Sequence, residues 1–208
     1  MTIERKFISD SIIKLNISRF LSKELMKAGF SRVSIQKTPI ITRINLYVLY
    51  SGKVIGRGGK TIDALKENIK RNFNIYNPQI TVNEVQNRML EPMLVARHMS
   101  EMLERGFNPR KLIQMTLRSI IENGAMGAEI RLSGKLQAKK AKTRTIIKRV
   151  GYIPKAGDVT NLVSEAITAA YPKYGAIGIQ VRIVPPGTVF PGQKTKNVEL
   201  PKSIATAR

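Results

Sequence analysis

The sequence predicts an α+β protein with two domains, and three observations support this class. The chain has 208 residues, a length that suits one large domain or two modest ones, and its hydrophobic share of 42% is enough for a real core. Stretches with helical periodicity and stretches with strand periodicity are interspersed along it. A connector at about 86–91 separates two such sets. We therefore expect domains at 1–86 and 87–186, followed by an extended basic tail at 187–208.

The first domain is expected to run helix, strand, strand, helix, glycine turn, helix, strand. A helix over 10–29, ended by a glycine, follows from apolar residues that recur every fourth position: Ile13, Ile17, Leu21 and Leu25. Alternating apolar residues predict three strands, which lie near 33–35, at about 40–49 and from Pro78 onward. A very short helix follows Ser51-Gly52, and a longer one spans about 59–73.

The second domain is expected to place two helices on a sheet of several strands. One helix covers about 91–105, and the next has Asn108 as its N-cap, Pro109 in its first turn and Asn123-Gly124 at its end. Strands are expected at 126–136, 143–152 and 175–184. The stretch 159–170 is ambiguous, because its apolar residues fit the spacing of a helix: Val159, Leu162, Val163, Ala166, Ile167 and Ala170.

The charge of the chain points to a polyanionic partner. It has 36 Lys and Arg against 14 Asp and Glu, a formal net charge of +22, and the excess is spread over both halves. Such a field destabilises a fold through self-repulsion unless an anion neutralises it. Nucleic acid is the common anion, since each neutralised phosphate releases a counterion. A membrane surface is not expected, because the apolar runs are only a few residues long.

Residue types that support catalysis or metal binding are scarce. The chain has no cysteine and one histidine, which excludes disulfides, thiolate zinc sites, cysteine nucleophiles and histidine clusters. His98 is interpreted as a polar residue on a helix flank, and Asp63 with Glu67 as partners in surface salt bridges. No signal peptide is evident at the N-terminus. We expect a cytoplasmic binding protein without a cofactor, a metal, a small-molecule substrate or an enzymatic activity.

A glycine turn between two helices is the first candidate RNA site, formed by Gly56, Arg57, Gly58, Gly59 and Lys60. Glycines let the backbone turn sharply and let a sugar-phosphate strand approach closely. The N-terminus of the following helix adds unpaired N–H groups and the positive end of its dipole. This combination is how a KH domain clamps about four nucleotides. A nucleotide-binding P-loop is rejected, because Val54 stands where that motif requires glycine.

Two further basic segments lie in the second domain. On the helix near 109–123, basic and amide residues share one sector, opposite an apolar one: Arg110, Lys111, Gln114 and Arg118. The second segment contains no acidic residue between Glu129 and Asp158, and its cations are Arg131, Lys135, Lys139, Lys140, Lys142, Arg144, Lys148 and Arg149. Because an ordinary surface mixes its signs, we expect this stretch to contact phosphate.

Two strand motifs, together with the glycine turn, resemble one known family. The segment 127–136 reads Gly-Ala-Glu-Ile-Arg-Leu-Ser-Gly-Lys-Leu, and 174–181 reads Tyr-Gly-Ala-Ile-Gly-Ile-Gln-Val. Both are similar to strands of the universal small-subunit ribosomal protein numbered three, in its archaeal or eukaryotic form. The first domain resembles a type II KH domain. The resemblance covers nearly all of residues 10–185 and implies a strand in place of a helix at 159–170, which completes a four-stranded sheet.

The resemblance also implies a location and partners. It places the chain in the head of the small ribosomal subunit, with ribosomal RNA as the main partner and other head proteins as neighbours. It also implies that the second domain lines the channel where messenger RNA enters during translation. In the family, basic residues at the start of the helix matching 109–123 grip the message, and Arg110 and Lys111 align with them. Gln114 stands where the bacterial form is again basic.

Two alternative functions stay open, a DNA-lesion lyase and a free-standing RNA-binding regulator. Some eukaryotic members of this family are credited with nicking DNA at damaged sites, and a lysine amine could form a Schiff base with an abasic sugar. No arrangement of residues in the sequence demonstrates that activity. A free-standing RNA-binding regulator is the other alternative, and its unrelieved charge would bind RNA indiscriminately.

Overall fold

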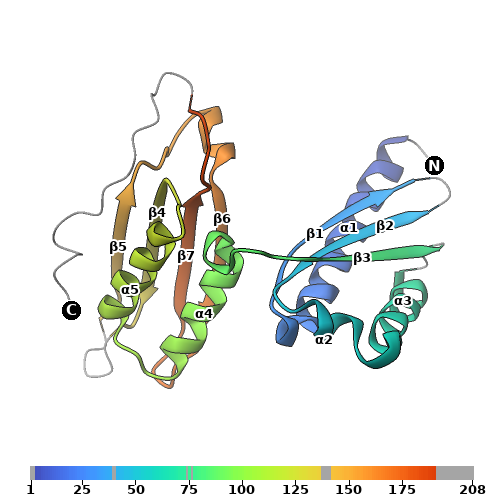
Figure 1. Ribbon diagram of the computed structural model, residues 1–208, viewed down its shortest axis with the longest axis horizontal. Helices are drawn as coiled ribbons and strands as arrows, with labels where there is room; N and C mark the ends of the chain where they lie inside the picture. The colour runs from blue at the N-terminus through green and yellow to red at the C-terminus, as the bar shows by residue number, and fades with distance from the viewer. Residues whose placement is uncertain (1–2, 39–40, 74, 76, 137–141, 191–208) are drawn as a thin grey trace. The chain divides into compact units, whose positions relative to one another are not determined.

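The computed structural model describes residues 3–38, 41–73, 75, 77–136 and 142–190. The chain divides into two compact units, Met1–Gln86 and Asn87–Arg208, and each unit carries helices on a sheet (Figure 1). The α+β class expected from the sequence is therefore confirmed.

The first unit follows the expected order of elements. Its helices and strands are α1 (Ile3–Glu24), the 3-10 turn η1 (Met26–Ala28), β1 (Phe30–Lys37), β2 (Thr42–Val48), α2 (Ser51–Ile55), the 3-10 turn η2 (Arg57–Gly59), α3 (Lys60–Phe73) and β3 (Pro78–Glu84). β2 is the central strand, antiparallel to β1 and parallel to β3. The parallel pair requires a crossover, and α2 and α3 supply it together with the turn between them.

The core of the first unit lies between the sheet and the helices. Alternate residues of the central strand are fully buried, so one face of the sheet is covered. The largest buried side chains come from α1, α3 and β2: Ile17, Leu21, Ile69, Ile44 and Leu46. This covered face supports α2 and α3, and with them the glycine turn.

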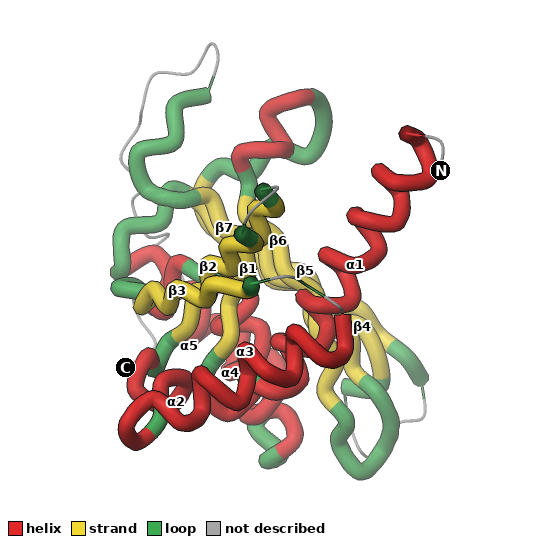
Figure 2. Tube along the Cα trace, turned by 90° about the vertical axis from the view of Figure 1, so that its right-hand side faces the viewer, coloured by secondary structure: helices red, strands yellow, loops and turns green. Residues whose placement is uncertain are grey.

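Helix α1 begins earlier than its periodicity predicts. It starts at Ile3 where the sequence indicated about residue 10, and it gives way to η1 before Gly29, which adopts a left-handed conformation with φ 71°. The first turns extend away from the three-stranded sheet (Figure 2) and leave Phe7 and Ile8 exposed by 77% and 58%. Because the apolar side chains of these turns are exposed, no buried stripe marks them in the sequence.

The second unit places two helices on one face of an antiparallel sheet (Figure 1). Its elements are the 3-10 turn η3 (Arg88–Leu90), α4 (Pro92–Glu104), α5 (Pro109–Glu122), β4 (Gly127–Gly134), β5 (Arg144–Gly151), the 3-10 turn η4 (Asp158–Leu162), β6 (Ser164–Ala170) and β7 (Ile177–Val184). The strand order is β5-β4-β7-β6, so the last two strands add beside the first hairpin. The core is formed by the inner faces of α4, α5, β4 and β7.

The helical pattern at 159–170 proves wrong for most of that stretch. Residues 158–162 form η4, and Ser164–Ala170 form β6, which pairs with β7 along its whole length. Ala166 and Ala170 are buried beneath α4. This stretch forms a strand because β7 would otherwise lack a partner on that side. The backbone hydrogen bonds between β6 and β7 outweigh the local helical spacing of the apolar residues.

The end of the described chain is more ordered than an extended tail predicts. Phe190 is 5% exposed, and its ring meets that of Tyr152 edge to face, with 5.2 Å between the ring centroids. Within the tail expected at 187–208, Phe190 is therefore buried against the second unit. The rest of the expected tail, 191–208, lies outside the described residues.

Candidate nucleic-acid interface

The glycine turn adopts a backbone that only glycine accommodates without strain. Gly56, Gly58 and Gly59 have φ of 73°, 61° and 77°. This left-handed range places the Cβ of other residues too close to a carbonyl oxygen. The three glycines reverse the chain between α2 and α3, Gly56 just before η2 and the other two within it, as the sequence motif predicts.

The glycines have different surroundings. A Cβ added at Gly56 would lie 2.0 Å from Thr61 Oγ1, whereas one at Gly58 would meet nothing within 4 Å. Gly56 is therefore required by internal packing. Gly58 faces open space, so its bare backbone is the part of the turn that a sugar-phosphate strand can approach.

Contacts with the sheet hold the turn in place. Val54 of α2 is fully buried, and Ser51 Oγ donates a hydrogen bond to Glu84 Oε2 of β3 at 2.8 Å. The side chains of Leu65 and Ile69 anchor α3 in the same core. The turn is thus fixed between two helices that both pack on one sheet.

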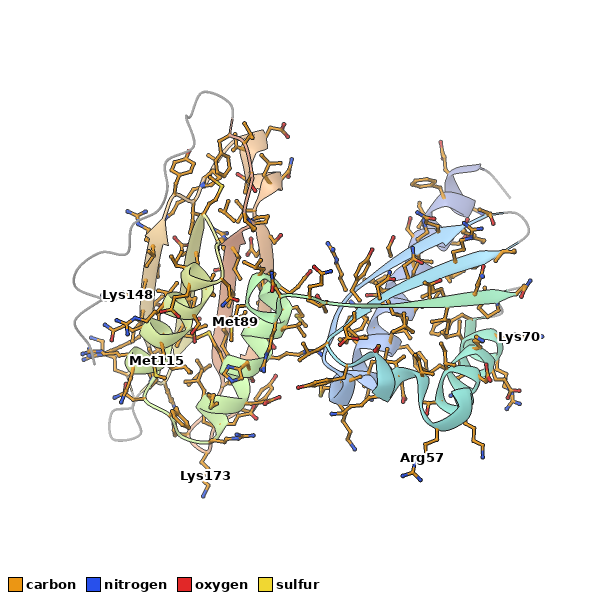
Figure 3. The ribbon with its side chains drawn as sticks, in the orientation of Figure 1. Arg57, Lys70, Met89, Met115, Lys148 and Lys173 are labelled. Atoms are coloured by element: carbon orange, nitrogen blue, oxygen red, sulfur yellow. The ribbon has the colours of Figure 1, made fainter. Side chains whose placement is uncertain are left out.

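The cations of the turn point outward without internal partners. Arg57 extends away from the first unit (Figure 3), and Lys60 is also exposed. Within the described part of the chain neither side chain makes an ion pair, whereas Asp63 pairs with Lys66 at 2.9 Å and Glu67 with Arg71 at 3.2 Å. The salt-bridge interpretation of these two carboxylates is confirmed. Arg57 and Lys60 are left available for an external anion.

The start of α5 carries the second set of predicted residues. Asn108 caps the helix, and its Oδ1 accepts a hydrogen bond from the Arg110 backbone N–H at 3.0 Å. Pro109 occupies the first position, as predicted. Arg110, Lys111 and Gln114 are exposed and Arg118 is half-buried, opposite the buried residues Leu112, Ile113, Leu117 and Ile120.

The electrostatics of this helix start favour an anion. Cations in the first turn of a helix face the positive end of its dipole, which disfavours them by on the order of 0.3–1 kcal/mol each. The first turn of α5 contains no acidic residue to offset this. Arg110 and Lys111 therefore contribute nothing evident to the stability of the helix. An external anion gives their position a physical reason.

A hollow opens beside the start of α5, and we call it the α5 hollow. It has a volume of about 740 Å³ and is lined by residues 106–110, residues 144–146 of β5, Leu136 and Tyr174. The fold thus brings Arg110 of the second predicted site next to Arg144 of the basic stretch. Sequence reasoning overlooked Phe107 and Tyr174, which line the hollow. Phe107 precedes the helix cap and carries no local signal of its own.

The basic stretch does not form a single surface. Cross-strand pairing places Arg131 and Arg149 on the sheet face away from the helices, whereas Lys148 pairs with the core residue Ile130 and so lies on the helix side. Lys135 and Lys142 are exposed between β4 and β5, and Arg144 lines the α5 hollow. Lys139 and Lys140 lie outside the described residues. The predicted cations therefore divide into several groups.

Part of the positive charge is neutralised within the second unit. Glu129 is 7% exposed, with Lys155 Nζ 3.7 Å and Arg182 Nη1 3.9 Å from its carboxylate oxygens. Arg182 also pairs with Glu165 at 3.2 Å, and Glu129 lies opposite Arg149 in the β4–β5 register. This row of alternating charge crosses the outer face of the sheet. Arg149 consequently has an acidic neighbour that the sequence order hides.

Groups suited to catalysis remain without support in the described residues. The pKa of His98 is lowered, chiefly by burial and further by the charge of Arg88, which leaves a half-buried imidazole among charged neighbours. No cluster of metal-ligating residues occurs among the described side chains. None of the described lysines is buried, so none has the desolvated pocket that activates an amine.

The described helices also include none with the length and apolar character to cross a membrane.

Each of the two units matches a known family. Residues 16–90 match the KH domain, which includes the glycine turn and the sheet that supports it. Residues 99–183 match the C-terminal domain of ribosomal protein S3, which includes α5, the α5 hollow and the four-stranded sheet. The two matches occur in the order that the sequence motifs indicate.

Similar proteins align with nearly the whole chain. The chain is 34% identical to small ribosomal subunit protein uS3 of Methanoregula boonei over 213 residues, covering 100% of this chain and 91% of the relative. It is 36% identical to the uS3 protein of Methanospirillum hungatei over 192 residues, covering 92% and 80%. The uS3 protein of Methanothrix thermoacetophila is 38% identical over 192 residues, with 92% and 69% covered. With two domains in the same order and alignments of this extent, the chain belongs to the family of small ribosomal subunit protein uS3.

Proposed function

We propose that this protein is a structural component of the small ribosomal subunit, where it binds ribosomal RNA in the subunit head. The relatives are named as proteins of that subunit, and they align with the chain over most of their own length. The cations of the glycine turn and of the second unit neutralise phosphates of the ribosomal RNA. Other head proteins are its neighbours, and it works in the cytoplasm as part of the ribosome, without a catalytic role.

The observation that carries this proposal is a rigid glycine turn whose cations have no internal partner. Gly58 leaves the backbone open, and Arg57 and Lys60 project beside it. An isolated first unit would gain nothing from two unpaired cations at a helix start. A bound phosphate backbone gives the glycines and the cations a common role.

Arg110 and Lys111 are assigned to a different RNA. They lie on the other unit, at the start of α5, and the family resemblance associates this helix start with the channel through which messenger RNA enters. Their exposure and lack of partners in the described chain fit a strand that slides past. Gln114, one turn later, supplies a neutral contact in place of a third cation.

Sedimentation of cell extract tests the ribosomal assignment. On a sucrose gradient at low salt, most of the protein should travel with small subunits, because the complementary phosphate surface is there. If most of it stayed at the top of the gradient, the protein would instead be a free-standing regulator. At high salt the protein should be released gradually as its phosphate contacts are screened.

The DNA-lesion lyase has no specific observation in its favour. A lyase needs one lysine that reacts in preference to the others. Borohydride trapping on abasic DNA, with each lysine replaced in turn, separates the two cases. Loss of trapping through one lysine would support an enzyme, whereas equal trapping in every variant is the expected result of nonspecific amines.

A further inference from the structure

The α5 hollow combines features that the messenger contact of Arg110 and Lys111 does not require. It is a concave site of about 740 Å³, within the range of pockets that hold small organic groups. A sliding strand needs only exposed cations, not a depression. The shape and the lining therefore indicate a more specific ligand.

The charged part of the lining is entirely basic. Arg110 comes from α5 and Arg144 is the first residue of β5, so two distant segments each contribute an arginine to the lining. Neither guanidinium makes an ion pair or a side-chain hydrogen bond within the described residues, and no acidic residue contributes to the lining. Two unneutralised guanidinium groups on one depression favour an anion, and planar donors of this kind suit phosphate.

The uncharged part of the lining is aromatic and apolar. Phe107 is 51% exposed in a loop, where a polar residue would be more favourable in water. The partly buried ring of Tyr174 lines the same hollow, and so do the apolar residues Leu136 and Ile146. Rings beside cations are the combination on which single-stranded nucleic acids stack their bases.

We infer that the α5 hollow binds one unstacked nucleotide of a single-stranded RNA, with its base against Phe107 and Tyr174 and its phosphate at Arg110 and Arg144. An acidic peptide would satisfy the guanidinium groups but would give the rings no flat partner. A base and a phosphate together use both parts of the lining. The inference rests on the proposed function, because it assigns a base-holding role to the site where the messenger is proposed to pass.

Photo-cross-linking of the full-length protein to a 5-iodouridine hexanucleotide tests this inference. Under ultraviolet light this base joins to aromatic side chains on which it stacks, and the modified peptide is identified by mass spectrometry. We expect cross-links at Phe107 or Tyr174. At RNA concentrations below saturation, Phe107→Ala should lower the yield at Tyr174 roughly 5-fold or more, as expected for loss of one base–aromatic stack. Arg144→Gln should lower it as well.

Tyr171→Ala is the matched control. Tyr171 is 73% exposed in the same unit and does not line the hollow, so its loss should leave the yield unchanged. A hexamer whose sugars lack bases should compete only weakly, because it offers phosphate without a stacking group. The inference is overturned if cross-links form elsewhere only, or if the base-free hexamer competes as well as the intact one.

Assembled small subunits separate this inference from the proposed function. If 5-iodouridine in the messenger cross-links to the hollow, both stand. If only uridines of the ribosomal RNA do so, the hollow holds a nucleotide but the messenger assignment fails. If Phe107→Ala changes no cross-link while an Arg110 and Lys111 double variant impairs messenger handling, the inference about the hollow fails alone.

Discussion

Gly56 and Gly58 show that two glycines of one turn can have different structural requirements. The φ of 73° at Gly56 and the absence of room beside Thr61 exclude any side chain. Gly58 shares the left-handed backbone but has open space around it. The two glycines therefore differ in role. Gly56 is required by internal packing, whereas Gly58 leaves its backbone accessible.

Substitution of these glycines should show the difference in stability. Gly58→Ala should lower the free energy of unfolding by about 1–2 kcal/mol, the cost of a left-handed alanine. Gly56→Ala should cost more, because its Cβ would also lie 2.0 Å from Thr61 Oγ1. Urea titrations of both variants measure this. Equal losses would mean that the helix start relaxes freely around residue 56.

A negative charge at position 58 should weaken RNA binding more than it lowers the stability of the fold. Gly58→Asp places a carboxylate where the phosphates are proposed to bind, and Asp tolerates the left-handed region. Its control is Gly58→Asn, which has nearly the same shape without the charge. We expect filter-binding affinity for ribosomal RNA fragments to fall several-fold more with Asp than with Asn. Similar losses with both would place the RNA away from this turn.

His98 makes the stability of the second unit depend on pH. Burial and the nearby Arg88 lower its pKa, so the unfolded chain binds a proton more readily than the folded one. The free energy of unfolding should therefore fall as the pH drops below about 6.5, the ordinary value for histidine. His98→Gln cannot take up this proton, and its urea midpoint should fall less between pH 7 and pH 5.5. An identical fall in both proteins would assign the pH dependence to carboxylates.

At the scale of elements, α5 combines a buried apolar face with an exposed, basic N-terminal turn. Its apolar face covers the four-stranded sheet, while the Asn108 side chain accepts a hydrogen bond from the Arg110 backbone N–H. Arg110 and Lys111 follow within the first turn, where they contribute no packing. A helix whose stability comes from one face can present unfavourable cations on another.

Replacing Arg110 and Lys111 together with alanine should impair messenger handling but not assembly. The two side chains are exposed and lack internal partners in the described chain, so the fold should tolerate their loss. The matched control is Arg19→Ala with Lys23→Ala, which removes two exposed cations from α1. Messenger binding to purified small subunits should weaken in the first variant only. A drop in the yield of assembled subunits would instead show contact with ribosomal RNA or a neighbouring protein.

At the scale of the whole molecule, a formal charge of +22 is only partly available to RNA. Ion pairs such as Arg182 with Glu165 and Lys37 with Asp10 consume some cations internally. Others, such as Arg131 and Lys148, lie on opposite faces of one sheet. A single RNA strand therefore reaches a subset of the positive charge.

The salt dependence of RNA binding measures how many of the cations contact phosphate. For single-stranded RNA the slope of log affinity against log salt is about −0.7 per phosphate contact. Arg57→Ala with Lys60→Ala should make the slope shallower by roughly 1.4, the share of two contacts. The Arg19 and Lys23 variant has the same net charge and should keep the original slope. If both variants changed it equally, binding would follow net charge and not the turn.

Local signals in the sequence were enough for most element ends and for the glycine turn. The Asn108 cap, Pro109 in the first turn and the Gly124 end are short-range preferences of the backbone, and the structure confirms each of them. The motif at 56–60 is likewise defined by conformations that only its own residues control. Such features depend on neighbours a few positions away, which a sequence shows directly.

Long-range contacts decided the rest. β6 became a strand because β7 needed a partner, against the helical spacing of its own residues. The α5 hollow depends on bringing residues 106–110, Leu136, residues 144–146 and Tyr174 together from four segments, which no local pattern records. The sequence thus determined an α+β, strongly basic chain with a glycine turn between two helices. Only the tertiary structure decided which cations share a surface, because a strand's two faces and its neighbours are set by pairing across the sheet.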